Sequence, residues 1–189
     1  MDGLNNTFKY KLIKNFLPKE ERLLLLDYTR IKHRTNMASF DFAQNNNGDT
    51  FFYADPLMES LMLQKRDLIA DSINLKIYPT YSFWRMYTYN AILKEHIDRP
   101  SCEISVTAMI GSCGTEWPII MDGNSIELEP GDAVIYKGCE IFHSRDAFKG
   151  DWHSQAFLHY VDYNGPYMEY AMDKREIWGI QQQAQRTNK

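Results

Sequence analysis

Two histidines and an aspartate have the types and spacing of a metal-binding set. His96 and Asp98 are separated by one residue, and His143 follows further along the chain, after a Pro-Gly-Asp turn at 130–132. Residues i and i+2 of a β-strand project to the same face, so His96 and Asp98 can share one ion. Two imidazoles and one carboxylate bind one face of Fe(II) and leave the other open. The sequence therefore predicts a non-haem iron site suited to oxygen chemistry.

The first part of the chain, residues 1–77, has the pattern of a strand and two helices that support a larger core. The segment from Phe8 to Phe16 alternates apolar and polar residues, as a half-buried strand does. A helix is predicted from Pro18 to Ile31, and four of its residues are expected to cover a sheet: Leu23, Leu24, Leu26 and Tyr28. A second amphipathic helix is predicted from Leu57 to Ile73.

From residue 78 onward the pattern changes to short strands. These strands are expected at 83–89, 104–110, 117–121, 125–128, 133–136 and 154–161, and a hairpin turns at 122–124. Two helices followed by about seven antiparallel strands predict an α+β, mainly β chain with a jelly-roll core over 78–163. The whole chain, 1–189, is expected to be one domain, and residues 164–189 a partly flexible C-terminal extension.

Composition restricts the class of protein. The net charge of −4 disfavours a nucleic-acid surface, and the three cysteines lack the CxxC spacing of a structural zinc site. No signal peptide or membrane-length apolar run is visible, so a soluble, cytoplasmic protein is expected. The aromatic content of 14% suits a β-rich core with a stacked pocket.

The run from Trp84 to Val161 resembles the prolyl-4-hydroxylase-like branch of the 2-oxoglutarate- and Fe(II)-dependent dioxygenases. Four features occur in the family's order: Tyr87 nine residues before His96, the strand residues 105–107, the Gly-Asp strand start at 131–132, and His143. The resemblance implies a double-stranded β-helix (a cupin-like jelly roll) in which His96, Asp98 and His143 hold the iron. It also implies 2-oxoglutarate and O2 as cosubstrates, release of succinate and CO2, and hydroxylation of an unactivated C–H bond.

One position departs from the family pattern. The family has an arginine or lysine about ten residues after the distal histidine, where it pairs with the far carboxylate of 2-oxoglutarate, and this chain has His153. A protonated imidazole could supply the charge, and Arg145 offers a permanent planar donor. We therefore expect Arg145 and His153 to anchor the carboxylate, with a hydrogen bond from Tyr87, and we rank Lys137 last.

Other functions and substrates are compatible with this pattern. A cupin-like metal-dependent isomerase or hydrolase and a non-catalytic jelly-roll binding module are the alternatives, and copurifying iron with 2-oxoglutarate-dependent succinate release would separate them from an oxygenase. The substrate is expected to be a small molecule or a peptide or protein, without a membrane partner. No oligomeric state is indicated. His159 and Asp132 are interpreted as structural residues.

Overall fold

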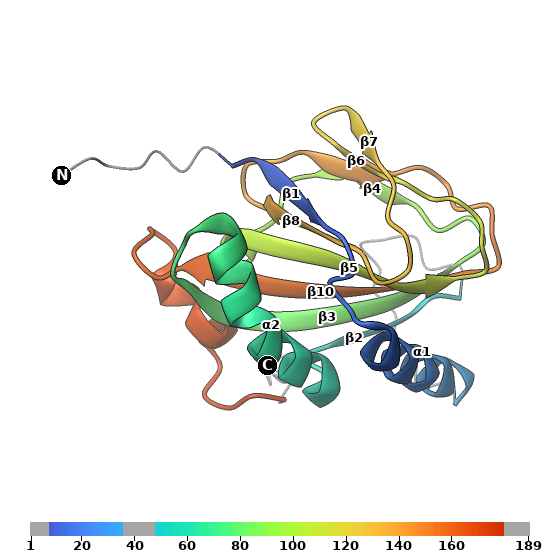
Figure 1. Cartoon of the computed structure of the whole chain (residues 1–189), viewed down its shortest axis with the longest axis horizontal. Helices are drawn as coiled ribbons and strands as arrows, with labels where there is room; N and C mark the ends of the chain where they lie inside the picture. The colour runs from blue at the N-terminus through green and yellow to red at the C-terminus, as the bar shows by residue number, and fades with distance from the viewer. Residues whose placement is uncertain (1–7, 36–47, 180–189) are drawn as a thin grey trace, which may run out of the picture.

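Two antiparallel sheets face each other in the computed structural model, which describes residues 8–35 and 48–179, and two helices cover one of them (Figure 1). The larger sheet has the order β1-β8-β5-β10-β3-β2, and the smaller sheet the order β4-β9-β6-β7. The larger sheet comprises β1 (Tyr10–Ile13), β2 (Thr50–Tyr53), β3 (Ile77–Thr88), β5 (Ile104–Ser112), β8 (Ala133–Lys137) and β10 (Trp152–Asp162). The smaller sheet comprises β4 (Leu93–His96), β6 (Ile119–Met121), β7 (Asn124–Ile126) and β9 (His143–Arg145).

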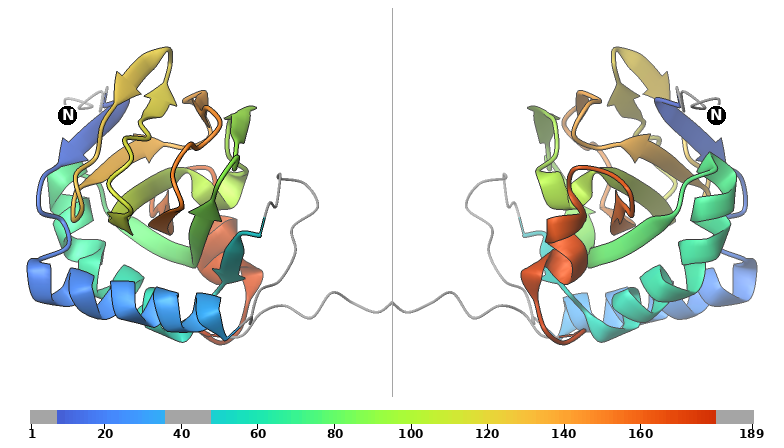
Figure 2. Two further views of the ribbon diagram at one scale, coloured as in Figure 1. Left: turned by 90° about the vertical axis from the view of Figure 1, so that its right-hand side faces the viewer. Right: turned by 90° about the vertical axis from the view of Figure 1, so that its left-hand side faces the viewer.

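This arrangement confirms the predicted mainly β jelly roll with N-terminal supporting helices. Figure 2 shows the helices below the larger sheet and the smaller sheet above it, so the molecule has three layers. The predicted hairpin is present, because β6 pairs with β7 across Asp122 and Gly123. The short strands β2, β4 and β9 were not among the segments expected, and β3 is longer than its predicted segment.

The helix α2 (Pro56–Ile73) has sequence-encoded boundaries. Asp55 caps its start by accepting from the backbone N–H groups of Leu57 and Met58, and the proline occupies a first-turn position that needs no donor. Asn74 ends the helix in the left-handed conformation. The buried Asp55 carboxylate also accepts from the Tyr28 hydroxyl at 2.6 Å, so one side chain both caps α2 and holds the neighbouring helix.

That neighbouring helix, α1 (Lys19–Arg34), packs in a different rotation from the predicted one. Leu23 and Leu24 are 42% and 63% exposed, so the prediction that they cover the sheet was wrong, and Leu25 is buried instead. Gly111 of β5 lies against Leu26, where an added Cβ would come within 3.4 Å of the leucine. A run of four leucines does not define a face, and the sheet surface selects which of them is buried.

Strict alternation along the central strands separates an apolar face from a polar face. On β3, Trp84 and Met86 join the core between the larger sheet and the helices, whereas Phe83, Arg85 and Tyr87 face the space between the sheets. The strands β5, β8 and β10 follow the same rule: Ile104, Val106, Ile135, Leu158 and Tyr160 all belong to the helix-side core. The inner faces therefore carry the side chains available for chemistry.

The described part of the C-terminal segment packs against the body of the protein. After β10 it forms short turns at Met168–Lys174, and Arg175 then reaches into the interior. The Arg175 guanidinium lies 2.5 Å from the Glu59 carboxylate of α2 and donates to the carbonyl oxygen of Thr80 at 3.0 Å. Neither α1 nor α2 is long and apolar enough to cross a membrane.

We predict that Arg175→Ala destabilises the protein by about 3 kcal/mol, because it leaves the Glu59 carboxylate buried without its counter-ion. The matched control is Lys174→Ala, which removes an exposed pair with Glu169 and should cost less than about 0.5 kcal/mol. Urea unfolding of both variants measures the difference. Equal losses of stability would contradict the assignment of Arg175 as the buried anchor.

Candidate metal centre

The three predicted ligands, His96, Asp98 and His143, meet at one end of the space between the sheets. His96 ends β4 and His143 begins β9, and the two residues face each other across this strand pair. One ligand atom from each of the three side chains lies within 4.8 Å of the others. The pairing of two short strands therefore brings together two histidines that are far apart in the sequence.

Asp98 does not lie on the strand that carries His96. The strand β4 ends at His96, so the expectation that one strand supplies both residues was wrong. The backbone N–H of Asp98 instead donates to the carbonyl oxygen of Gly138 at 2.8 Å, which directs the chain from the smaller sheet toward the larger one. The carboxylate still faces the imidazoles, because its Oδ1 lies 3.6 Å from Nε2 of both His96 and His143.

Backbone hydrogen bonds fix the tautomer of both histidines. Nδ1 of His96 lies 2.7 Å from the carbonyl oxygen of Lys94, and Nδ1 of His143 lies 3.0 Å from that of Ile141. A carbonyl oxygen only accepts, so each Nδ1 carries the proton and each neutral ring presents the Nε2 lone pair. Two lone pairs and the Asp98 carboxylate oxygen thus converge without a proton between them. This donor set fits a divalent cation, whose ligands lie about 2.0–2.2 Å from the metal.

The second oxygen of Asp98 is held by residues of the larger sheet. Oδ2 accepts from the Ser105 hydroxyl at 2.9 Å and from the Tyr136 hydroxyl at 3.3 Å. Gly138 packs against the same group, since a Cβ there would lie 2.6 Å from Oδ2 and 2.1 Å from a backbone oxygen. One carboxylate oxygen is therefore fixed by neighbours, and the other is left to face the histidines.

The protonation behaviour of the three groups differs. Burial lowers the pKa of His143, which favours its neutral form, whereas the adjacent Asp98 raises the pKa of His96, so a cation bound at Nε2 would compete with a proton there. Burial acts to raise the pKa of Asp98, but the hydrogen bond with His96, together with the effects of the other two histidines and Ser105, outweighs burial and lowers the pKa. At neutral pH the centre therefore contains an ionised carboxylate beside a neutral His143, which are the forms that ligate metals.

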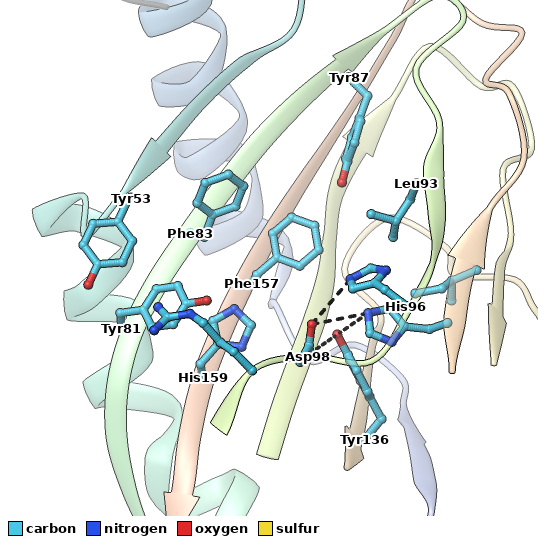
Figure 3. Close-up of a pocket in the computed structure, with 13 residues that line it drawn as sticks. Tyr53, Tyr81, Phe83, Tyr87, Leu93, His96, Asp98, Tyr136, Phe157 and His159 are labelled. Carbon is cyan, nitrogen blue, oxygen red and sulfur yellow. Dashed lines mark hydrogen bonds and ion pairs between the residues drawn. The ribbon is translucent and has the colours of Figure 1, made fainter. Parts of the chain in front are cut away.

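A cavity of about 260 Å³ opens beside the three residues, and its walls are mainly aromatic (Figure 3). In the view of Figure 3, Tyr87 lies above the metal-binding residues with its hydroxyl pointing into the cavity, and Tyr81 and His159 lie to their left. Besides His96, Asp98 and His143, the lining consists of Tyr53, Tyr81, Phe83, Tyr87, Leu93, Arg99, Ile119, Tyr136, Phe157 and His159.

The three residues predicted to bind 2-oxoglutarate surround Trp117. The Tyr87 ring centre lies 4.8 Å from that of Trp117, the His153 ring 5.2 Å, and the Arg145 guanidinium carbon 4.8 Å from the ring centre. Tyr87 lines the cavity beside the metal centre, whereas His153 lines a second cavity of about 290 Å³ on the other side of Trp117. Lys137 pairs with Glu140 at the surface, away from both.

Arg145 and His153 are buried, and each has one nitrogen that lacks a hydrogen-bond partner. Nη1 of Arg145 donates to the carbonyl oxygen of Trp117, but Nη2 has no partner, and the described residues give this guanidinium no acidic neighbour. The Gln155 side-chain oxygen accepts from Thr107, so the Gln155 amide nitrogen faces His153 and donates to its Nε2. The proton of the neutral His153 ring is therefore on Nδ1, which has no partner. Burial lowers the pKa of Arg145 to about 10 and that of His153 well below 6.5. At neutral pH Arg145 is therefore charged and His153 neutral.

Three side chains to which no role was assigned from the sequence contribute here: Ser105 and Tyr136 bond to Asp98, and Trp117 contacts Arg145 and His153. His159, interpreted as structural, lines the cavity and bonds to Ser105 at 3.0 Å, and burial lowers its pKa to about 4. The alternation of apolar and polar residues along β5, β8 and β10 indicated which side chains face inward. It did not indicate which of these side chains contact one another. Asp132 has the predicted turn role, since it accepts from the backbone N–H of Asn15 and Glu129.

Comparisons with known proteins identify the fold. No protein-family model and no curated protein sequence matches this chain. Among solved structures, a prolyl-4-hydroxylase from Pseudomonas putida is similar, with a TM-score of 0.66, 18% identity, and coverage of 82% of this chain and 94% of that one.

Two further similar structures are complexes with a small molecule or a peptide. The epimerase SnoN, in complex with Fe3+, α-ketoglutarate and nogalamycin RO, has a TM-score of 0.65 and 10% identity over 81% of this chain and 78% of its own. A prolyl hydroxylase from Trichoplax adhaerens, in complex with a peptide fragment of hypoxia-inducible factor, has a TM-score of 0.61 and 15% identity over 83% and 85%.

These similarities extend over most of each chain. The chain therefore has the double-stranded β-helix fold of the prolyl-4-hydroxylase-like 2-oxoglutarate- and Fe(II)-dependent oxygenases.

Proposed function

We propose that this protein is an Fe(II)- and 2-oxoglutarate-dependent dioxygenase. The observation that carries the proposal is the convergence of Nε2 of His96 and His143 on the Asp98 carboxylate. Beside it, Arg145 and His153 each have one buried, unpartnered N–H and surround Trp117, whose ring contacts the cavity-lining Tyr87. The first group is suited to a divalent cation, and the second to an organic anion. A dicarboxylate that binds between them would use both.

The residues have separate roles in this proposal. His96, Asp98 and His143 hold the iron, and Arg145 and His153 bind the far carboxylate of 2-oxoglutarate. Burial raises the pKa of Tyr87, so its phenol keeps its proton and can donate to the same carboxylate. When bound, iron and 2-oxoglutarate supply oxidative decarboxylation, with release of succinate and CO2 and oxidation of a substrate C–H bond by O2. The protein orients these groups and excludes water with its aromatic walls.

Hydroxylation of a C–H bond in a small molecule or a peptide is the reaction we favour. Proteins with this fold include prolyl hydroxylases and an epimerase, and their complexes contain a peptide or a small molecule, so the fold does not select one reaction. A metal-dependent isomerase or hydrolase, or a binding module, would leave the unpartnered donors of Arg145 and His153 unexplained. Buried donors without acceptors are costly, and this supports a cosubstrate anion.

The first test is iron binding by the three proposed ligands. We expect one Fe(II) per chain, and we expect His96→Ala, Asp98→Ala and His143→Ala each to weaken binding by more than about 100-fold and to abolish succinate release. Asp98→Glu should also fail, because the added methylene displaces the oxygen. His33→Ala is the control, since its ring bonds to Thr50 outside the site. Full iron affinity in two of the three ligand variants would show that the ligand set is wrong.

The second test concerns the groups that orient Asp98. We predict that Ser105→Ala lowers Fe(II) affinity by about 10- to 100-fold, because the carboxylate loses the hydroxyl that fixes Oδ2. Ser125→Ala, on the exposed strand β7, is the matched control and should bind iron normally. Anaerobic Fe(II) titration measures both. Wild-type affinity in Ser105→Ala would contradict the orienting role.

The third test separates the two anchors of 2-oxoglutarate. We expect Arg145→Met to weaken 2-oxoglutarate affinity by about 10- to 100-fold and His153→Ala by about three- to tenfold, because only Arg145 is charged. Lys137→Met should leave the affinity unchanged. The pKa of His153 lies well below 6.5 and that of Arg145 at about 10, so neither group titrates between them. Affinity should therefore stay flat from about pH 7 to 9 and fall as the pH approaches the pKa of Arg145.

The measurement is a titration of 2-oxoglutarate into the iron-loaded protein at several pH values. Affinity that declines steadily as the pH rises through 6 to 8 would instead identify a charged His153 as the main anchor. Unchanged affinity in both variants would place the anchor elsewhere.

A further inference from the structure

The cavity has a second region whose walls are uncharged and aromatic. It lies on the side of the metal centre where Tyr53, Tyr81, Phe83, Phe157 and His159 line the space (Figure 3). The Tyr81 ring lies 4.9 Å from Tyr53 and 4.5 Å from His159, so three rings form one continuous wall. Such walls favour flat groups, because ring faces and edges gain contact area and quadrupole attraction together.

The charged groups of this region are already neutralised. Arg99 binds Asp173 through two parallel hydrogen bonds of 2.7 and 2.8 Å, and its guanidinium lies 4.6 Å from the centre of the Tyr81 ring. Asp173 also accepts from the hydroxyls of Tyr53 and Ser101. Away from the proposed iron ligands, the region therefore offers a substrate no unpaired charge among the described residues.

His159 supplies the free polar atom of this wall. The Ser105 hydroxyl has one proton and lies beside two groups that only accept, the Asp98 carboxylate and the carbonyl oxygen of Cys102. When it donates to Asp98, as in the orienting contact described above, Nδ1 of His159 is the donor in the bond with Ser105. Nε2 is then a bare acceptor. This nitrogen has no hydrogen-bond partner in the described part of the chain, but it is not fully buried. It is therefore accessible from the cavity that His159 lines.

The ring of His159 is also held rigidly. Arg99, Tyr81 and His159 stack in that order, and Ser105 joins the other edge of the imidazole to Asp98. The acceptor therefore has a fixed position relative to the proposed iron ligands. A fixed acceptor can select an orientation as well as a ligand class.

We propose that His159 determines substrate specificity, and that the substrate presents to the metal a planar, uncharged group with an N–H or O–H donor directed at Nε2 of His159. The inference rests on the proposed function, because it identifies this region as the substrate side of the same cavity. It favours an aromatic or conjugated small molecule over a charged or purely aliphatic group. A ligand that lacks the donor leaves the acceptor unpaired, which costs affinity.

Indole and benzofuran test this proposal, because they share a shape and only indole has the donor. We expect the wild-type protein, loaded anaerobically with Fe(II) and 2-oxoglutarate, to bind indole about tenfold more tightly, the size of one net hydrogen bond. His159→Phe keeps a ring of similar size and should remove the preference, whereas His33→Phe, outside the cavity, should retain it. Ligand-detected NMR titrations give the affinities.

A measurement on the wild-type protein covers the case in which His159→Phe does not fold. The 15N resonance of His159 Nε2 should shift on addition of indole and not of benzofuran. Equal affinities for the two probes, or a preference that persists in His159→Phe, would overturn the proposal. Each titration is repeated without metal. If the protein binds no iron but still prefers indole, the proposed function is refuted and this inference is not. If the protein binds iron but shows no preference for indole, this inference is refuted and the proposed function is not.

Discussion

The position of the Asp98 carboxylate joins the two sheets and sets the geometry of the candidate centre. Asp98 follows the last residue of β4 in the smaller sheet, and the hydroxyls that bond to its Oδ2 come from β5 and β8 of the larger sheet. Its backbone N–H is held by Gly138, a residue whose missing side chain leaves room for the carboxylate. A change in the separation of the sheets would therefore move the oxygen that faces His96 and His143.

The protein interior contains buried polar groups that lower the stability of the fold, so selection for stability alone does not explain them. Arg145 is buried without an acidic neighbour among the described residues, and His153 has an enclosed proton without an acceptor. Elsewhere the buried charges are paired, as in Arg85 with Asp49 and Arg175 with Glu59. Since a buried charge is costly when unpaired, the contrast between these pairs and Arg145 indicates a site prepared for an anion.

The surroundings of the metal-binding residues differ in charge and shape. Around Trp117, which contacts the cavity-lining Tyr87, the protein has a cation and hydrogen-bond donors, whereas the cavity wall at Tyr81 has ring faces and one acceptor. Under the proposed function, a dicarboxylate cosubstrate and a conjugated, uncharged substrate would therefore be recognised by different groups.

The sequence by itself determined the features that depend on local pattern and residue chemistry. Alternation along the strands after residue 78 predicted the jelly roll, and the spacing of His96, Asp98 and His143 predicted a ligand set that the fold does bring together. Local pattern could not decide how elements meet across long sequence distances. It did not select Leu25 over Leu24 on α1, because the helix phase is set by the sheet beneath it.

Nor could the sequence alone show that β4 ends before Asp98, or that Ser105 and Tyr136 converge on the same carboxylate oxygen. The pairing of sheets decides those contacts, and it also makes His153 a neutral donor by desolvation and turns His159 into a fixed acceptor on the cavity wall. Burial and the exact set of neighbours control protonation and hydrogen bonding, and both are properties of the tertiary structure.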